Sequence, residues 1–242
     1  MNYFYGWKRD IPDIRDLDFP VPEMGKLPVA IDLRPDCPPV YDQGALGSCT
    51  ANAISAHLDF NRHKQGEPFI SPSRLFIYFN ERLADGDTQS DGGSSIRESA
   101  KTVAAQGACP ESEWEYDISK FAETPSDSCY IDAVKYEALK YYRLNQSEQL
   151  MKACLAQGFP FVCGISVYES FQESNGDVPM PAMSESLLGG HAILIVGYEA
   201  DSWLFRNSWG TVWGDSGYGT LPKDYLFQPD LSDDRWTLRQ VK

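Results

Sequence analysis

The chain has 242 residues, 42% of them hydrophobic, and carries a formal net charge of −14 at pH 7 with a pI of about 4.6. A chain of this size can bury a large core in one or two subdomains, and so acidic a balance argues against nucleic acid or an anionic membrane as a partner. No apolar run approaches the roughly 20 residues of a membrane span, and residues 1–7 show no signal peptide, so we expect a cytoplasmic protein or one exported by a non-standard route.

Helix signals dominate the first half of the sequence. Each predicted helix begins or ends at a capping residue, because the terminal backbone groups of a helix need partners. Three helices are expected there: residues 49–64, stopped by Gly66; residues 71–82, begun by Ser71 as N-cap and Pro72 in the first turn; and residues 95–107, begun by the capping box Ser95–Glu98 and stopped by Gly107.

Strand signals dominate the second half. Residues 110–129 are crowded with Pro, Ser, Asp and Thr, which predicts a long surface loop, and Ser147 caps a short helix that ends at Gly158. Apolar runs then predict three strands at residues 159–167, 191–198 and 203–206. We expect the last two to pair through a turn near residues 199–201. Helices first and strands later indicate the α+β class.

Cys49 is the candidate nucleophile. The stretch from Gln43 to Cys49 reads QGALGSC, a glycine-rich turn directly before a predicted helix. A thiol at a helix N-terminus feels the positive end of the helix dipole, which favours the thiolate. Gln43 supplies an amide donor for the oxyanion that forms when a thiolate attacks a carbonyl. The five other cysteines lack this setting.

His191 is the candidate base. His57 and His63 share the helix of Cys49 and lie roughly 12 and 21 Å further along its axis, too far for a direct hydrogen bond. His191 follows two glycines and precedes an apolar strand, which would hold the imidazole rigidly. On its own it would more often be a core histidine; the joint arrangement with Cys49 favours the catalytic interpretation.

Asn207 is the candidate group that orients the histidine. It follows the strand predicted at residues 203–206 and precedes Ser208, Trp209 and Gly210. Its amide oxygen can accept the ring N–H of His191, and we expect Trp209 to keep water off that bond. The order is Cys first, with His and Asn roughly 140–160 residues later, the spacing of papain and the cathepsins.

The chain therefore resembles the papain-like cysteine peptidases. The motifs that carry the resemblance are Gln43, Gly47-Ser48-Cys49, Gly92-Gly93, His191, Asn207-Ser208-Trp209-Gly210 and the glycine-rich segment from Trp213 to Gly219. Two positions depart from the family pattern: Leu46 stands where a cysteine is usual and Thr50 where an aromatic residue is usual. The lost cysteine removes a common disulfide, so the loop before Cys49 must be held by packing.

The resemblance implies a two-lobed fold with an active-site cleft between the lobes. It places a helical lobe at about residues 40–130 and a β lobe at about residues 131–242, within a peptidase domain of residues 27–242. The main substrate pocket is expected beside Gly92, Gly93, Gly190 and Ala192, with Gly164 as a third wall. These small walls suggest a roomy pocket for bulky apolar or aromatic side chains, although Gly92-Gly93 could equally be a plain loop between helices.

Residues 1–26 precede the resemblance and are rich in aromatic side chains. We consider two interpretations: an extension packed on the outside of the core, or a short pro-segment that lies over the cleft and blocks it. The segment is much shorter than the helical inhibitory propeptides common in this family.

The remaining cysteines are Cys37, Cys109, Cys129, Cys154 and Cys163. Cys109 and Cys129 bracket the loop at residues 110–129 and are the best candidates for a disulfide, if the chain contains one. Cys154 and Cys163 are expected to be buried free thiols. No C-x-x-C pair or Cys/His cluster suggests zinc, and no cofactor is expected.

The expected function is a cysteine peptidase, in the first place an endopeptidase, that acts on protein or peptide substrates as a monomer. Two alternatives stay open on the same residues. One is a peptide acyl-transferase, ligase or exopeptidase with a different cleft floor. The other is an inactive binding module, which the intact set of Cys49, His191, Asn207 and Gln43 makes improbable.

Overall fold

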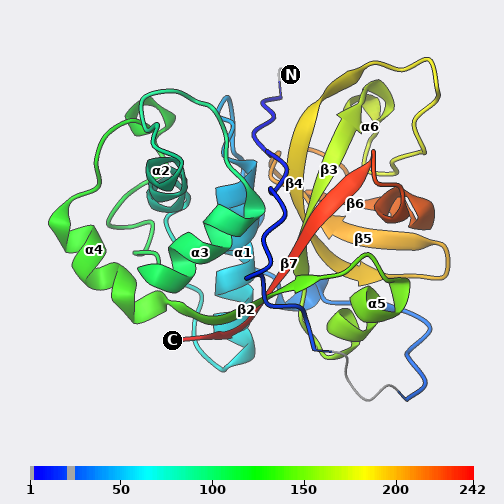
Figure 1. Ribbon diagram of the computed structural model, residues 1–242, viewed down its shortest axis with the longest axis horizontal. Coiled ribbons are helices and arrows are strands. Elements are labelled where there is room, and N and C mark those ends of the chain that lie inside the picture. The colour runs from blue at the N-terminus through cyan, green and yellow to red at the C-terminus, as the bar shows by residue number, and fades with distance from the viewer. Residues whose placement is uncertain (1–2, 21–24) are drawn as a thin grey trace.

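The helical side of the molecule is built around one central, almost fully buried helix (Figure 1). A computed structural model describes residues 3–20 and 25–242. The central helix is surrounded by two further long helices of the N-terminal half, and three shorter helices follow later in the chain. The helices are α1 (Cys49–Lys64), α2 (Arg74–Ala84), α3 (Ile96–Ala105), α4 (Asp127–Ala133), α5 (Glu148–Ala156) and α6 (Glu169–Glu173), with 3₁₀ turns at Arg34–Asp36, Ile118–Lys120, Val134–Tyr136 and Lys223–Phe227.

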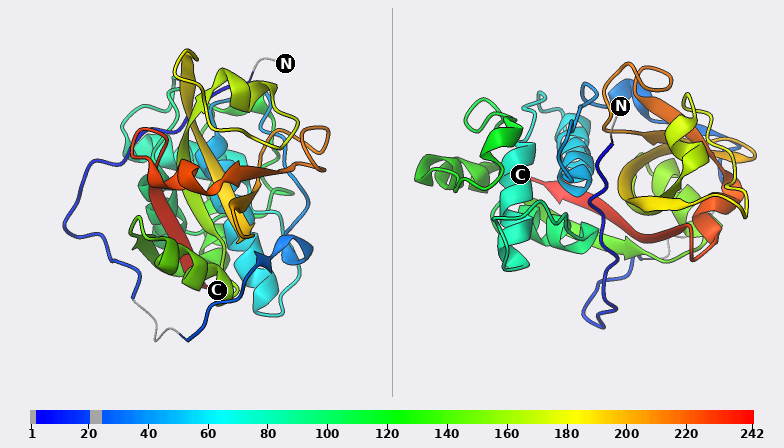
Figure 2. Two further views of the ribbon diagram at one scale, coloured as in Figure 1. Left: turned by 90° about the vertical axis from the view of Figure 1, so that its right-hand side faces the viewer. Right: turned by 90° about the horizontal axis from the view of Figure 1, so that it is seen from above.

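A strongly curved antiparallel sheet forms the other side (Figures 1 and 2). Its strands are β1 (Ile31–Asp32), β2 (Ala138–Leu144), β3 (Phe161–Tyr168), β4 (Leu187–Tyr198), β5 (Ser202–Arg206), β6 (Tyr218–Pro222) and β7 (Ser232–Val241). Their spatial order is β2-β7-β3-β4-β5-β6, and β1 pairs with β4. β7 is a long strand that packs against α1 and α3 and pairs with β2 and β3, so it joins the two sides.

Two hydrophobic clusters account for the two lobes. One gathers α1, α2 and α3 against β4 and β7, with Ile54, Leu75, Val196 and Trp236 among its buried residues. The other fills the interior of the curved sheet and includes Phe161, Trp203 and Phe205. Each cluster buries the apolar side chains of its own lobe. The fold is thus α+β and two-lobed, as the sequence predicts.

Most of the predicted elements are confirmed, and their capping residues act as expected. The side chains of Ser95 and Ser147 accept hydrogen bonds from the backbone N–H groups of Glu98 and Leu150, at the starts of α3 and α5. Gly107 and Gly158 have φ values of +75° and +76° just beyond the ends of those helices. β4 and β5 pair in antiparallel fashion through the predicted turn.

Three local predictions were wrong. α2 begins at Arg74 and its N-cap is Ser73, whose side chain accepts from Phe76 N, whereas Pro72 forms a bridge with Pro110. The loop predicted at residues 110–129 already contains the 3₁₀ turn at 118–120 and the start of α4. Strands β1, β2, β6 and β7 were missed: β1 has only two residues, and the apolar and polar residues of the others do not alternate cleanly along the sequence.

All six cysteines are free thiols in the structure, so the suggested Cys109–Cys129 disulfide is not formed. Both of these thiols are buried beside each other, and their proximity contributes to a raised pKa of Cys109 after the larger effect of burial. Cys154 and Cys163 are buried free thiols, as predicted. Among the described residues, no helix is both long enough and apolar enough to cross a membrane.

Candidate active site

Cys49 is the first residue of α1 and is completely buried. Backbone hydrogen bonds from Ala192 and Gly6 reach its thiol. Ala192 directly follows His191, so these bonds place the start of α1 against β4. Burial nevertheless raises the pKa of the Cys49 thiol to about 11, because desolvation penalises the thiolate more than the hydrogen bonds favour it. The thiolate expected from the helix dipole alone is therefore not favoured in this state.

His191 and Asn207 are joined by the hydrogen bond that the sequence predicts. The distance from His191 Nε2 to Asn207 Oδ1 is 2.8 Å. The same oxygen accepts the backbone N–H of Ser208 at 2.8 Å, which identifies it as an acceptor and places the ring proton on Nε2. Nδ1 is left without a hydrogen-bond partner among the described residues. Burial lowers the pKa of His191 to about 4, so the imidazole is neutral near pH 7.

Trp209 lies flat against the imidazole, with ring centroids 4.9 Å apart at an interplanar angle of 28°. Only 3% of Trp209 is exposed. Phe171 meets the edges of both rings from the other side. These aromatic side chains surround the His191–Asn207 bond and exclude water from it, which keeps the hydrogen bond in a low-dielectric environment.

The side-chain amide of Gln43 is positioned to donate a hydrogen bond to a carbonyl group in the cleft. Its Oε1 accepts a hydrogen bond from Ser208 Oγ at 2.6 Å, which fixes the orientation of the amide. Its Nε2 donates to the carbonyl oxygen of Leu46 at 2.9 Å and to the carbonyl oxygen of Phe4 at 3.0 Å. The amide thus already holds one peptide carbonyl that belongs to neither lobe.

Residues 3–10 run as an extended chain between the two lobes, seen as the dark blue segment near the centre of Figure 1 and crossing the molecule in Figure 2. Trp7 N donates to Gly190 O at 3.0 Å, Ser94 N donates to Gly6 O at 2.9 Å and Lys8 N donates to Ser94 O at 2.9 Å. Tyr3 stacks on Trp209 with ring centroids 3.8 Å apart. We call residues 3–10 the cleft segment.

Glycines make this close approach possible. A Cβ on Gly6 would lie 1.7 Å from the carbonyl oxygen of Gly47, and a Cβ on Gly93 would lie 2.0 Å from the carbonyl oxygen of Gly6. Gly93 also has a φ of +66°, which other residues rarely adopt. A Cβ on Gly164 or Gly190 would collide with Trp7. Four of the predicted pocket residues, Gly93, Gly164, Gly190 and Ala192, thus border the cleft segment or the thiol.

Gly92 also borders the cleft segment, but only at the end of the Lys8 side chain. A Cβ at this position would be 3.5 Å from Lys8 Nζ and Ser90 Oγ, so the residue faces polar side-chain ends and not the buried part of the cleft.

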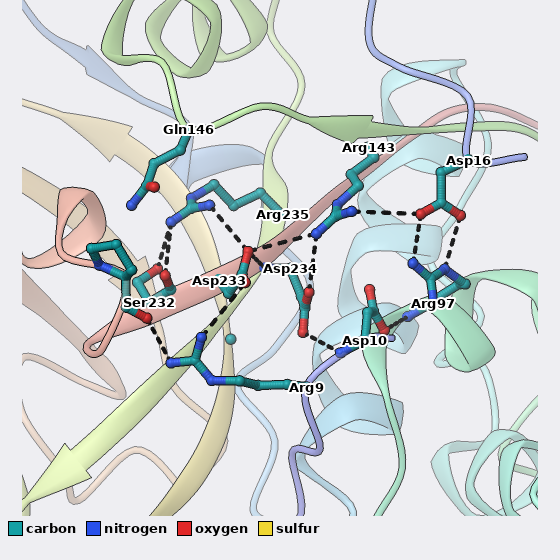
Figure 3. Close-up of polar contacts among 12 residues, drawn as sticks. Arg9, Asp10, Asp16, Arg97, Arg143, Gln146, Ser232, Asp233, Asp234 and Arg235 are labelled. Atoms are coloured by element: carbon teal, nitrogen blue, oxygen red, sulfur yellow. Dashed lines mark hydrogen bonds and ion pairs between the residues drawn. The ribbon is translucent and has the colours of Figure 1, made fainter. Parts of the chain in front are cut away.

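Two features of the site were missed by the sequence interpretation. The first is Trp7, which is 7% exposed and occupies the predicted pocket. The second is Asp234 of β7, a fully buried carboxylate that accepts the indole N–H of Trp7 at 3.2 Å. The aromatic content of residues 1–26 was the available signal for Trp7. Asp234 (Figure 3) lies 227 positions from Trp7, and no sequence pattern connects the two residues.

The fold agrees with comparisons to known proteins. The sequence profile described as papain family cysteine protease matches residues 27–227. The chain belongs to this family and is a papain-like cysteine protease.

Three relatives illustrate this membership. The structure is similar to that of xylellain, a cysteine protease from Xylella fastidiosa, with 41% identity, a TM-score of 0.92 and coverage of 98% of this chain and 96% of that one. The sequence is 36% identical to an uncharacterized peptidase C1-like protein of Acanthamoeba polyphaga mimivirus over 95% of this chain and 76% of that protein. It is 27% identical to a cysteine proteinase of Trypanosoma brucei brucei over 82% of this chain and 44% of that protein.

Proposed function

We propose that the protein is an endopeptidase whose nucleophile is Cys49 and whose general base is His191. The observation that carries this proposal is the peptide carbonyl of Phe4, held by Gln43 Nε2 at 3.0 Å in the cleft where Cys49 lies. A substrate carbonyl in the same place would be polarised by the amide and open to attack by the thiol. Asn207 is the orienting residue, since it fixes the ring proton of His191 on Nε2.

The reaction follows from these positions. His191 Nδ1 takes the thiol proton, and the Cys49 sulfur forms a bond to the substrate carbonyl carbon. The oxygen becomes an oxyanion that Gln43 Nε2–H stabilises. The proton on Nδ1 then passes to the amine nitrogen as the C–N bond breaks, which leaves a thioester. A water molecule gives a proton to Nδ1 and attacks the thioester, and the C–S bond breaks to restore the thiol.

The direct test replaces the nucleophile. Cys49→Ala is expected to abolish peptide hydrolysis, and circular dichroism should show an unchanged fold, because alanine fits wherever the thiol does. Peptide mapping after treatment with E-64, an epoxide that alkylates papain-like active-site cysteines, should place a single adduct on Cys49. Retained hydrolysis by Cys49→Ala would show that another residue is the nucleophile.

We also propose that residues 1–26 are a pro-segment that blocks the cleft. Three observations support this: the cleft segment occupies the Gln43 amide, stacks on Trp209 and fills the glycine-walled pocket with Trp7. The thiol of Cys49 also receives the backbone N–H of Gly6, which belongs to the same segment.

Removal of the segment tests this proposal. A chain that lacks residues 1–26 should hydrolyse peptides faster than the full chain and react faster with E-64, provided that its circular dichroism and thermal transition show a folded protein. An unchanged or lower rate in a folded protein would refute the blocking role and leave the peptidase proposal intact.

The endopeptidase preference rests on the path of the cleft segment. The segment lies beside Trp209, passes the thiol and continues beyond Trp7 toward Asp10, so the described residues 3–10 follow an extended path that meets no wall within the cleft. An exopeptidase needs such a wall to hold a chain terminus. Internally quenched peptides that are blocked at both ends should therefore be cleaved. Cleavage only of peptides with a free terminus would contradict the preference.

A further inference from the structure

Ser48 stands at the N-cap of α1 but does not cap the helix. A serine at this position ordinarily has an extended backbone, and its hydroxyl accepts a backbone N–H of the first turn. In the described structure Ser48 has φ −95° and ψ 24°, and its side chain accepts no hydrogen bond from the helix. The residue is completely buried and directly precedes Cys49. The direction of its hydroxyl therefore determines which donors the start of α1 offers to the thiol.

Two neighbours hold the Ser48 hydroxyl away from the end of the helix. Asn52, one turn along α1, donates from Nδ2 to Ser48 Oγ at 3.0 Å and to the Ser48 carbonyl oxygen at 2.9 Å. The Tyr116 hydroxyl lies 2.5 Å from Ser48 Oγ and donates to the carbonyl oxygen of Gln43 at 3.0 Å. Because Tyr116 gives its proton to Gln43, the Ser48 hydroxyl donates to Tyr116. The hydrogen bonds thus run in one direction, from Asn52 to Gln43.

Arg74 of α2 holds both of these neighbours in place. Its guanidinium carbon lies 3.8 Å from the centre of the Tyr116 ring. Its Nη1 donates to Asn52 Oδ1 at 3.2 Å, which turns the amide nitrogen of Asn52 toward Ser48. Arg74 is only 7% exposed, and two hydrogen bonds to the carboxylate of Glu111 balance its charge. The surroundings of the Ser48 hydroxyl are therefore rigid.

The N–H group that an N-cap serine would accept has another partner here. Burial raises the pKa of the Cys49 thiol to about 11, and hydrogen bonds to the sulfur, among them one from the backbone N–H of Thr50, offset part of this rise. Thr50 is the second residue of α1, so a hydroxyl in the ordinary capping position would accept the same N–H. Such a hydroxyl would compete with the sulfur for this donor.

We propose that Tyr116 is a positioning residue for the nucleophile. Its hydroxyl keeps Ser48 from capping α1, so that the N–H of Thr50 remains with the sulfur. The same hydroxyl fixes the carbonyl group of Gln43, and both ends of the turn at residues 43–48 therefore depend on Tyr116. The inference rests on the proposed peptidase function, since it concerns the reactivity of the thiol that the mechanism uses.

The test removes one hydroxyl. In Tyr116→Phe the ring keeps its place beside Arg74, and Ser48 can return to the capping conformation. Alkylation of Cys49 by iodoacetamide, a small reagent that needs no oxyanion donor, should slow about tenfold near pH 7, and the midpoint of its pH profile should rise by about one unit, because the thiolate loses one hydrogen bond. The cleft segment is present in every full-length variant, so its effect is common to the rates compared.

A second substitution distinguishes this role from general damage to the structure. Ser48→Ala removes the competing hydroxyl, so the double variant with Tyr116→Phe should recover the natural alkylation profile to within about twofold, whereas structural damage would add up. Ser48→Ala alone should change the profile little. Glu81 of α2, whose charge acts on the sulfur, and His191 of β4, its proposed base, are the same in every variant.

Tyr130→Phe is the matched control. It removes a hydroxyl of the same lobe, and the described partner of that hydroxyl is Asn80 of α2 at 3.0 Å. The alkylation rate of this variant should stay within about twofold of the natural rate. Asn52→Ala frees the Ser48 hydroxyl from its other neighbour. This variant should shift the profile in the same direction as Tyr116→Phe, and it serves as the test if Tyr116→Phe does not fold.

Peptide mapping identifies the alkylated cysteine, and circular dichroism with thermal unfolding shows which variants are folded. An unshifted profile in folded Tyr116→Phe, or a double variant as slow as Tyr116→Phe, would overturn the role of Tyr116 and leave the peptidase proposal intact. An adduct that maps to another cysteine in the natural chain would instead contradict the proposed function.

Discussion

Replacement of Trp7 by alanine should release the cleft segment and increase the rate of peptide hydrolysis. The indole is 7% exposed and packs against Gly164 of β3 and Gly190 of β4, two strands that pair with each other, and a buried tryptophan covers about 150–250 Å². At about 25 cal/mol per Å² the gross gain from burial is about 4–6 kcal/mol. Ordering of the segment offsets part of this, so we expect docking to weaken by about 2–4 kcal/mol. The ratio of docked to undocked molecules should fall by about 30- to 700-fold.

The assay for this change is the second-order rate at which E-64 alkylates Cys49, measured beside kcat/KM on a short peptide. Both rates report the undocked fraction, and both should rise until that fraction approaches one. Phe4→Ala is the matched control, because Phe4 is 40% exposed and contributes its backbone carbonyl, which alanine keeps. If folded Trp7→Ala is alkylated at a rate within twofold of that of the natural chain, burial of the indole does not hold the segment and the reasoning fails.

Three further predictions concern charged and titrating groups. Burial and the neighbouring charge of Asp10 raise the pKa of Asp234 to about 7 when the segment is docked, and both effects lessen when the segment leaves, so docking takes up protons and weakens as pH rises through about 7. The alkylation rate should therefore climb more steeply from pH 5 to pH 8 in the natural chain than in Asp234→Asn, and parallel profiles would contradict this. Burial lowers the pKa of His57 to about 3. Below about pH 6.5 the unfolded chain therefore binds a proton at this histidine that the folded protein does not bind, and the free energy of unfolding falls as pH decreases. Urea denaturation should show that His57→Leu removes a loss of about 2 kcal/mol between pH 7.5 and pH 5, and an unchanged loss would refute the assignment. Arg97→Ala leaves Asp16 largely buried with only a longer contact to Arg143, which should weaken docking by about 1–3 kcal/mol and speed hydrogen exchange at Phe19. Arg15→Ala removes the exposed ion pair with Asp13 and should change neither rate. Equal effects of the two substitutions would argue against a role for the Arg97–Asp16 ion pair in docking.

The parts of the site that the sequence predicts are those encoded in short motifs. Cys49 needs only the turn before it and the helix after it, and both are readable from neighbouring residues. His191 lies within β4 and Asn207 directly follows β5, and these strands are joined by one turn, so their approach follows from a local hairpin. The helices with serine caps were predicted for the same reason, because a cap involves residues three positions apart.

The parts that could not be predicted depend on contacts between distant segments. β7 pairs with β2 and β3, yet its mixture of charged and apolar residues has no simple period. The charge state of Cys49 depends on how completely the cleft segment buries it. Burial raises the pKa of the thiol, whereas the helix dipole alone predicted a lowered pKa. The start of α2 was misplaced for a local reason, because Ser71 and Ser73 are both suitable caps and only the bridge from Pro72 to Pro110 decides between them.

The fit of Gly6 has a genetic consequence. Its backbone touches Gly47 on one side and Gly93 on the other, at distances that leave no room for a Cβ. Any other amino acid at position 6 would push the segment away from both contacts, whereas no substitution there could tighten them. If the cleft segment blocks the site as proposed, single-base changes that replace this glycine would consequently yield an enzyme without its restraint. A selection for unrestrained proteolysis should therefore recover changes at position 6 early and repeatedly.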